Sequence, residues 1–191
     1  MIFVIDTSSA VNALAILDGG VAQELFLPAR SRELVDRMRS MATAHNLTKV
    51  AVATGPGSFT GLRTGVSFGL GIAMGLRIPI VPLPTLGLQA ARSHAPVLAV
   101  SEAGRGRVYY LEPAGRPGLA EPDELPRDWP VVGWLRPQTQ AALEGVGLHF
   151  KTENELESFG AAAAGVLKTA RDVPYGSLKL EYMQSFAVKA Q

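Results

Sequence analysis

Three short stretches of this sequence carry residue types that could bind a phosphate group. DTSSA (6–10) and GPGSFTG (55–61) each follow an apolar, β-branched run, and SEAGRG (101–106) follows a third. A carboxylate at a strand end can hold a hydrated Mg²⁺ beside phosphates. A glycine-rich turn that opens a helix can present backbone N–H groups to an anion. The chemistry to test is therefore phosphate binding or phosphoryl transfer.

The GPGSFTG stretch does not have the spacing of a common nucleotide-binding loop. Gly55, Gly57 and Gly61 are one residue too far apart for the dinucleotide fingerprint, and no Gly-Lys pair exists for a P-loop. The stretch instead predicts a sharp exit from a strand, with Ser58 or Thr60 capping the next helix. An anion at that helix N-terminus stays an open alternative.

A serine motif and the histidines were considered as catalytic groups. GVSFG (65–69) matches the nucleophile elbow G-x-S-x-G, but Ser67 falls inside a predicted helix rather than on the strand-to-helix turn that the elbow requires. His45, His94 and His149 are scattered and have no metal-ligand spacing. We therefore expect neither a catalytic residue nor a metal site.

Asp6, Thr7 and Ser8 resemble the first phosphate loop of the actin-like and sugar-kinase ATPases. Glu102 stands where the second phosphate loop of those ATPases would be, in place of the usual Asp, and Arg105 lies between its glycines. The pair of loops therefore resembles an eroded nucleotide site. An Asx-turn after a strand is the alternative interpretation of Asp6.

The predicted elements that position these loops define the fold class. The first half reads as strands 2–6, 12–17 and 21–27, a helix at 31–45, a strand at 49–54, a helix to residue 76, a strand at 78–84 and a helix at 85–93. Asp18-Gly19-Gly20 predicts a hairpin turn. Three antiparallel strands followed by alternating helices and strands are the order of an α/β, ribonuclease-H-like lobe.

The second half predicts a smaller lobe, so that the expected domains are 1–95 and 96–191. It reads as strands 96–101, 107–112 and 130–134, an exposed loop at 113–130, and helices at 138–144 and 153–172. The final helix is a candidate to pack back on the first lobe.

The helix after GPGSFTG carries a ridge of small residues, Gly61, Gly65, Gly69 and Ala73. Each glycine in a helix interior costs up to about 1 kcal/mol, so the ridge needs a compensating close approach. The approaching element can be a partner helix or the protein's own sheet, and the spacing does not separate the two. The amphipathic helix at 31–45 would supply the rest of a helical interface.

Composition and charge limit the class of protein. The 191 residues carry a net charge of +1 and no cysteine. The apolar run between Arg63 and Arg77 is too short and glycine-rich to span a bilayer. We expect a soluble, cytoplasmic protein without disulfides. Six cations and no acid lie between Arg37 and Ser101. Their dispersed spacing favours ordinary surface, with an anionic partner, RNA or an acidic protein, as the alternative.

Several of these stretches together resemble the bacterial TsaB family of tRNA threonylcarbamoyladenosine biosynthesis proteins. They are IDTSSAVNALAIL (5–17), GPGSFTGLRTGVSFGLGIA (55–73), the strand at Ile78-Pro79 and EAGRGRVYY (102–110). The resemblance covers residues 1–110 and weakens beyond them. It implies the actin-like (ASKHA) fold, with two lobes of which the C-terminal one is reduced.

The resemblance also implies a function. A TsaB protein is the non-catalytic subunit that supports a TsaD-like catalytic subunit, which transfers threonylcarbamoyl from threonylcarbamoyl-AMP to the adenosine next to the anticodon. The implied partners are the TsaD-like subunit, a TsaE-like ATPase through the complex, a second copy when alone, and tRNA indirectly, with no membrane. No cofactor is implied, and ATP or ADP at the complex interface stays open. The alternative is an independent ATPase or sugar-kinase-like enzyme, or a peptidase.

The implied site residues form three groups. The partner interface comprises Leu34, Val35, Met38, Met41, Gly61, Gly65, Gly69 and Ala73; the motif comprises Gly55, Pro56, Gly57, Ser58, Phe59, Thr60 and Arg63; and the vestigial nucleotide contacts are Asp6, Thr7, Ser8 and Glu102. The chain departs from the family where a His-Ser pair is replaced by Arg30-Ser31. It departs again in the divergent segments 113–150 and 176–191, whose structure the resemblance does not predict.

Overall fold

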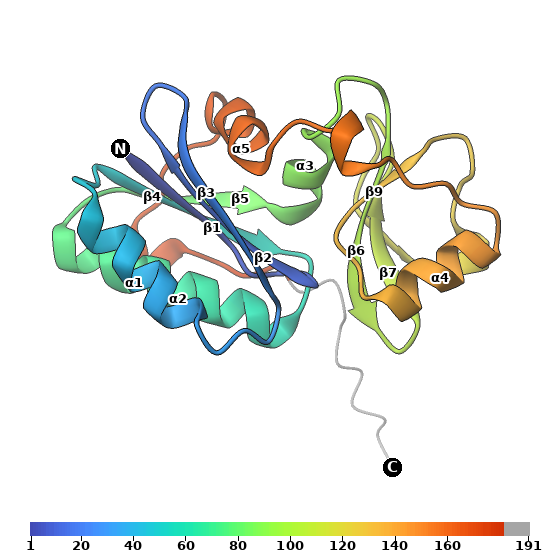
Figure 1. Ribbon diagram of the computed structural model, residues 1–191, viewed down its shortest axis with the longest axis horizontal. Coiled ribbons are helices and arrows are strands. Elements are labelled where there is room, and N and C mark those ends of the chain that lie inside the picture. Colours follow the sequence, from blue (N-terminus) through green and yellow to red (C-terminus); the bar gives the residue numbers. More distant parts are fainter. Residues whose placement is uncertain (182–191) are drawn as a thin grey trace, which may run out of the picture.

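The computed structural model describes residues 1–181 and contains two β-sheets with helices packed against them (Figure 1). The first sheet has five strands in the order β3-β2-β1-β4-β5. The strands are β1 (Ile2–Asp6), β2 (Val11–Leu17), β3 (Val21–Pro28), β4 (Lys49–Gly55) and β5 (Ile80–Pro84). β2 runs antiparallel to β1 and β3, whereas β4 runs parallel to β1 and β5. The order of strands and helices along the chain that was predicted for the first half is confirmed.

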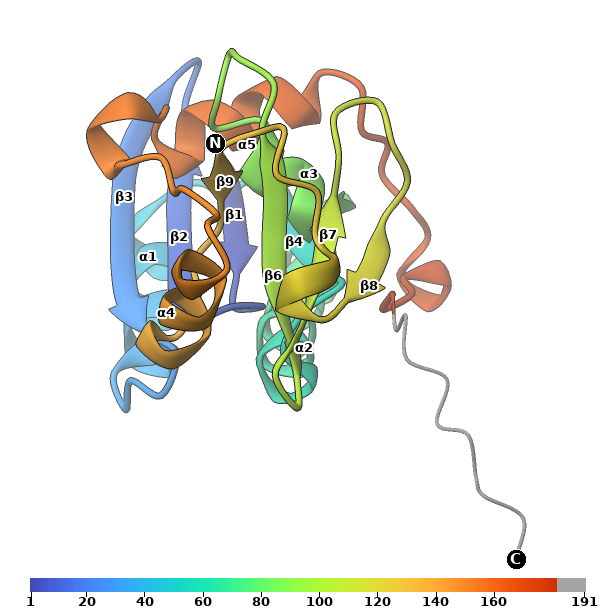
Figure 2. The same cartoon turned by 90° about the vertical axis from the view of Figure 1, so that its right-hand side faces the viewer.

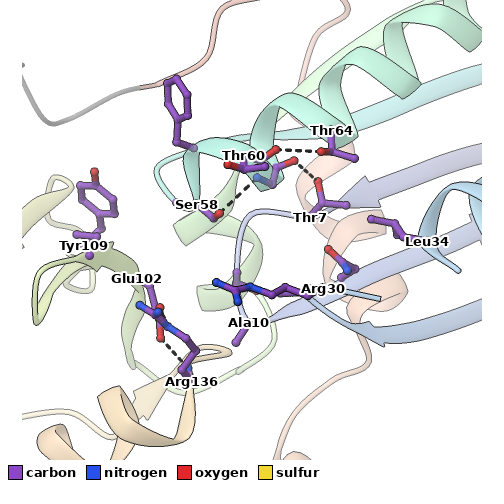
Figure 3. A pocket seen from close by; sticks show the side chains of 18 residues that line it. Thr7, Ala10, Arg30, Leu34, Ser58, Thr60, Thr64, Glu102, Tyr109 and Arg136 are labelled. Atoms are coloured by element: carbon purple, nitrogen blue, oxygen red, sulfur yellow. Dashed lines mark hydrogen bonds and ion pairs between the residues drawn. The ribbon is translucent and has the colours of Figure 1, made fainter. Parts of the chain in front are cut away.

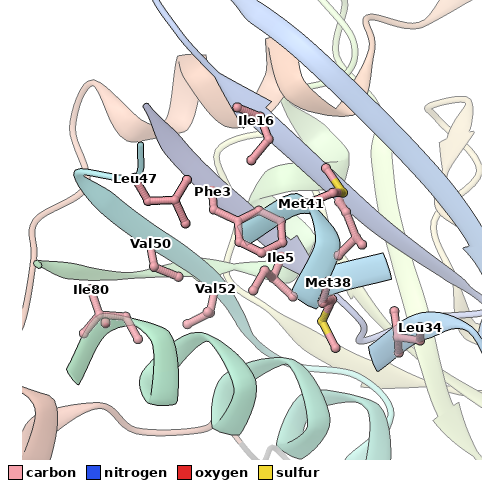
Figure 4. Close-up of a cluster of buried hydrophobic side chains, with 12 residues drawn as sticks. Phe3, Ile5, Ile16, Leu34, Met38, Met41, Leu47, Val50, Val52 and Ile80 are labelled. Atoms are coloured by element: carbon pink, nitrogen blue, oxygen red, sulfur yellow. The ribbon is translucent and has the colours of Figure 1, made fainter. Parts of the chain in front are cut away.

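Helices cover both faces of the first sheet. They are α1 (Leu34–Ala44), α2 (Phe59–Leu76), α3 (Thr85–Ala90) and α5 (Phe159–Leu167). Phe3 and Ile5 of β1 lie in the core with α1 and α2, whereas Val4 lies in the core with α3 and α5. Figure 4 shows the first of these cores. Because both faces of the central strands are buried, their sequences are almost continuously apolar.

The second sheet is smaller and has the order β8-β7-β6-β9. Its strands are β6 (Leu98–Gly104), β7 (Arg107–Leu111), β8 (Gly118–Ala120) and β9 (Val131–Val132), and α4 (Pro137–Gly145) packs against it. The predicted strand at 130–134 is therefore only two residues long. The expected loop at 113–130 contains β8 and the short 3₁₀ helix η1 (Pro122–Glu124). β8 forms there because it pairs with β7.

The prediction of one long helix at 153–172 was wrong. The segment divides into a 3₁₀ turn, η2 (Glu153–Glu155), and the helix α5. Thr152 and Glu155 close the short turn as a capping box. Ser158 then begins α5, because its side-chain oxygen accepts a hydrogen bond from the Ala161 N–H at 3.3 Å. Two N-terminal caps in succession therefore interrupt the helical pattern.

After the second sheet the chain returns to the first one (Figure 2). α5 contacts β2, β3 and α3. Val173 bridges to Ile80 of the edge strand β5, and the Tyr175 hydroxyl lies within hydrogen-bond distance of the Ala73 carbonyl in the last turn of α2 and the Ile78 carbonyl just after it. The Glu181 N–H donates to the Thr54 carbonyl at 2.8 Å. This last described segment covers the edge of β5 and reaches the start of the GPGSFTG turn.

The expected lobe boundary at residue 95 falls in the loop between α3 and β6. Residues 182–191, which the expected second lobe included, lie outside the described part of the chain. Within residues 1–181, no helix combines the length and the apolar character needed to cross a bilayer.

Candidate functional site

A cavity of about 450 Å³ lies between the two sheets, beyond the ends of β1 and β4 (Figure 3). Its walls include the loop that follows β1, the GPGSFTG turn that follows β4, and the end of β6 around Glu102. Arg30 from the first lobe and Arg136 from the second also line the cavity. The three stretches that suggested phosphate chemistry therefore surround one cavity.

Asp6 does not line this cavity. Its side chain is fully buried, and its Oδ1 accepts hydrogen bonds from the Ser8 N–H at 2.9 Å and the Ser8 hydroxyl at 2.5 Å. Burial raises the pKa of the Asp6 carboxyl, against the smaller lowering effect of the two Ser8 hydrogen bonds. The placement agrees with the Asx-turn. It corrects the expectation that Asp6 contacts a nucleotide in the cavity.

The GPGSFTG turn packs directly on the loop after β1. The Ser58 N–H donates to the Ser8 carbonyl at 2.7 Å, and the Thr7 hydroxyl donates to the Gly61 carbonyl at 2.6 Å. A Cβ on Gly57 would lie 2.5 Å from the Ser8 carbonyl oxygen, and one on Gly61 would lie 1.9 Å from that of Thr7. These two positions therefore require glycine because another backbone occupies the space.

Ser58 is the residue that caps α2, which decides between the two predicted caps. Its side-chain oxygen accepts a hydrogen bond from the Gly61 N–H at 3.3 Å. The first turn of α2 contains no acidic residue, and it lines the cavity. Arg63, one turn further on, lies over the Phe59 ring with its guanidinium carbon 3.7 Å from the ring centre.

The small-residue ridge of α2 faces the protein's own sheet, so its assignment to a partner interface was wrong. Gly65, Gly69 and Ala73 are buried, and a Cβ on Gly69 would lie 2.4 Å from a Val52 methyl group. At the remaining ridge residue, Gly61, the Thr7 backbone occupies the space that a Cβ would need. The ridge allows α2 to lie close to β1 and β4, which compensates for the low helix propensity of glycine.

The same correction applies to most of the α1 residues assigned to the interface. Leu34, Met38 and Met41 are at most 7% exposed and belong to the core between α1, α2 and the sheet (Figure 4). Val35 differs, because it is 44% exposed. The apolar face of α1 therefore packs on the protein's own core. Val35 is the one α1 residue of the predicted interface that faces outward.

Glu102 lines the cavity, but its carboxylate is paired with Arg136 of the same lobe. Its carboxylate accepts hydrogen bonds from the Arg136 N–H at 2.7 Å and from the Arg136 guanidinium. This ion pair connects β6 to the start of α4. No motif marks Arg136 in the sequence, whereas Arg30 occupies the position where the chain departs from the family's His-Ser pair.

The remaining candidate groups lie apart from one another. Ser67 is inside α2, as predicted. His45 contacts the Met41 carbonyl, and His94 pairs with Glu157. The described residues contain no group of three or more His, Asp or Glu side chains that could hold a metal ion.

The sheet order and the cavity between two lobes define the actin-like (ASKHA) class, and comparisons with solved structures agree. YeaZ from Pseudomonas aeruginosa superposes with a TM-score of 0.71 at 19% identity, over 95% of this chain and 99% of that one. A second structure, an uncharacterized protein with similarity to peptidase YeaZ from the same organism, gives a TM-score of 0.73 at 19% identity, over 96% and 99%.

Sequence comparisons identify the family. The model of TsaD, the tRNA N6-adenosine threonylcarbamoyltransferase, matches residues 31–117. The TsaB protein of Escherichia coli K12 is 27% identical over 58% of this chain and 54% of its own length. That of Bacillus subtilis 168 is 30% identical over 70% and 64%. The matched regions thus span between about half and two thirds of these relatives. This chain belongs to the TsaB family.

Proposed function

We propose that this chain is a cytoplasmic, non-catalytic subunit of a tRNA N6-threonylcarbamoyladenosine synthesis complex. It binds and supports a TsaD-like catalytic subunit, which transfers threonylcarbamoyl from threonylcarbamoyl-AMP to the adenosine next to the anticodon. The observation that carries the proposal is the match to relatives named tRNA threonylcarbamoyladenosine biosynthesis proteins. A TsaE-like ATPase joins through the complex, and ATP or ADP binds, if at all, at the complex interface.

The condition of the two carboxylates supports a non-catalytic role. Glu102, the carboxylate at the cavity, is paired with Arg136, and Asp6 lies away from the cavity, where burial raises the pKa of its carboxyl. A carboxylate that holds Mg²⁺ beside a phosphate must be ionised and accessible to the metal. Neither group meets both conditions in the described arrangement.

We propose that the TsaD-like subunit binds the outward side of α2, in place of the buried ridge. This outer α2 face consists of Gly71, Met74 and Gly75, and Leu76, the last residue of the helix, is also exposed. Met74 is 53% and Leu76 is 54% exposed, and a Cβ on either glycine would meet no atom within 4 Å. Large exposed apolar residues around a flat, glycine-lined surface favour the close approach of another helix. The same face would form the homodimer of the isolated chain.

A bulky substitution on the outer α2 face tests this interface. Gly71→Leu adds a side chain where the monomer leaves open space, so the fold is retained while a partner helix is held away. Gly165→Leu is the matched control, because Gly165 is a glycine of α5 with equally open space. We expect at least a tenfold loss of affinity for the TsaD-like subunit from the first variant only, measured by calorimetry. Equal affinities would place the interface elsewhere.

Deletion of the gene tests the role of the protein. We expect the threonylcarbamoyl nucleoside to disappear from bulk tRNA, as measured by mass spectrometry, and to return with the wild-type gene. The alternative of an independent ATPase or kinase-like enzyme predicts tight Mg²⁺-dependent ATP binding and turnover by the isolated chain. Normal nucleoside levels after deletion, together with such turnover, would refute our proposal. The GVSFG motif does not support the peptidase alternative, because Ser67 lies within α2 and not on a strand-to-helix turn.

A further inference from the structure

We propose that the rim of the cavity between the lobes binds the tRNA directly, through its phosphodiester backbone and one unpaired base. This cleft rim comprises Arg30, Phe59, Arg63, Arg105, Arg107 and Arg136. The inference deepens the proposed function, on which the choice of tRNA as the RNA rests. The cavity and the cleft rim do not depend on the proposed function, because they follow from the positions of the described residues.

Arginines from both lobes converge on this rim. Arg30 extends from the end of the first hairpin toward the Glu102–Arg136 pair of the second lobe (Figure 3). Among the described residues that line the cavity, Glu102 is the only carboxylate, and Arg136 neutralises it. The rim is therefore an electropositive edge, the kind of surface that attracts a nucleic acid backbone.

The turn between β6 and β7 adds two more cations to the same edge. Arg105 is exposed and follows Gly104, a cavity-lining residue. Arg107 stands two residues before Tyr109, another lining residue, so both side chains point to the same side of β7. The charge of Arg107 lowers the pKa of the Tyr109 hydroxyl, although burial raises that pKa by more. Cations from the end of the first hairpin and from the turn between β6 and β7 thus lie at one cavity, a pattern that the dispersed sequence positions did not reveal.

An exposed aromatic side chain lies among these cations. Phe59 lines the cavity, is 42% exposed and stacks against the Arg63 guanidinium. An exposed aromatic ring beside arginine is the usual stacking platform for an unpaired base. It also begins α2, whose first-turn N–H groups can contact a phosphate. Charge and stacking therefore occur together, as RNA binding requires.

The geometry favours an RNA strand over a single nucleotide with Mg²⁺. The rim cations come from separate elements rather than one loop, and Arg30, Arg105 and Arg136 are exposed to solvent, whereas Arg107 is half-buried. A nucleoside triphosphate brings Mg²⁺, which needs a carboxylate or similar oxygen ligand. Glu102 is paired with Arg136, and Asp6 lies outside the cavity. An extended polyanion needs the repeated cations and no metal ligand.

Binding of a fluorescein-labelled, unmodified tRNA transcript tests the inference, with anisotropy measured from 50 to 200 mM salt. Arg30→Ala combined with Arg105→Gly removes two charges, and glycine suits the positive φ of 56° at Arg105. We expect about a tenfold or greater loss of affinity and a salt slope less steep by about two. Replacing both residues by Lys should retain most of the affinity.

Two single variants complete the test. Phe59→Ala should weaken binding by about fivefold or more without changing the salt slope, because it removes stacking and no charge. Arg171→Ala is the control, since Arg171 is exposed in the segment that follows α5, away from the cavity. It should bind like wild type. Retained binding of the TsaD-like subunit by every variant would verify that each is folded.

Three results would overturn the inference. They are wild-type RNA affinity of the Arg30→Ala/Arg105→Gly variant, competition by micromolar Mg²⁺-ATP, which would assign the rim to a nucleotide, and equal competition by polyglutamate, which would assign it to an acidic protein. None of these results alters the deletion phenotype. If deletion removes the nucleoside but the rim variants bind tRNA as tightly as wild type, the proposed function is retained and this inference is rejected.

Discussion

Asp6 illustrates at the scale of one residue how burial decides the role of a carboxyl group. One oxygen, Oδ1, is satisfied by Ser8, whereas Oδ2 is buried without a hydrogen-bond partner among the described residues. An unpaired buried oxygen is much less costly on a protonated carboxyl than on a carboxylate. Asp6 therefore acts as a turn residue that positions the loop after β1, and its charge is a liability to the folded state.

The stability of the Asp6→Asn variant relative to wild type should increase as the pH rises. The folded-state pKa of Asp6 is raised above 3.8, so its contribution is fully present below that pH and is lost as the pH rises through the folded pKa. Asn retains an acceptor for the Ser8 N–H but does not ionise. Urea unfolding of both proteins at pH 4 and pH 8 measures the difference. The measured quantity is the unfolding free energy of Asp6→Asn minus that of wild type. A value that falls from pH 4 to pH 8 would contradict the raised pKa.

At the scale of the element, α2 carries small residues on two faces with opposite environments. Gly65, Gly69 and Ala73 lie against the sheet, whereas Gly71 and Gly75 face open space. The sequence predicted the ridge and the helix, and it limited the cap to Ser58 or Thr60, of which Ser58 is the cap. It could not predict which face meets the sheet, because a four-residue repeat of small side chains describes any close helix contact. That choice depends on the position of β1 and β4.

A matched pair of alanine substitutions on α2 should have effects of opposite sign. Gly69→Ala places a Cβ 2.4 Å from a Val52 methyl group and 3.2 Å from one of Val50, so we expect a loss of about 1–3 kcal/mol in the free energy of unfolding. Gly71→Ala meets no atom within 4 Å and should gain up to about 1 kcal/mol from helix propensity. Urea unfolding measures both, and two effects of the same sign would contradict the assigned orientation of α2.

At the scale of the whole molecule, the arrangement of the lobes was less predictable than the elements. The apolar runs of the first sheet predicted its strands, because the central strands β1, β2 and β4 are buried on both faces. The cavity combines Arg30, Glu102 and Arg136, which are far apart in the chain and belong to different elements. Only the tertiary fold brings such residues together. The comparable unpredicted feature is Trp134, which lies where the two lobes meet.

Trp134 joins the lobes through contacts to both. Its ring lies 5.8 Å from Phe26 and 6.0 Å from Phe159, between centroids, and the Arg92 guanidinium carbon lies 4.5 Å from its centre. Its indole N–H donates to Glu153 at 3.1 Å. These contacts attach the segment after β9 to β3, to α5 and to the residues that follow α3, and so hold the second sheet against the first.

Trp134→Ala should therefore cost about 2–4 kcal/mol in the free energy of unfolding, because it removes a large aromatic side chain from this junction and leaves Arg92 without its stacking partner. Trp134→Phe retains the ring contacts and loses only the hydrogen bond to Glu153, so we expect a cost of about 1 kcal/mol. Urea unfolding followed by far-UV circular dichroism measures both. If the alanine variant lost less stability than the phenylalanine variant, contacts other than those of Trp134 would hold the two lobes together.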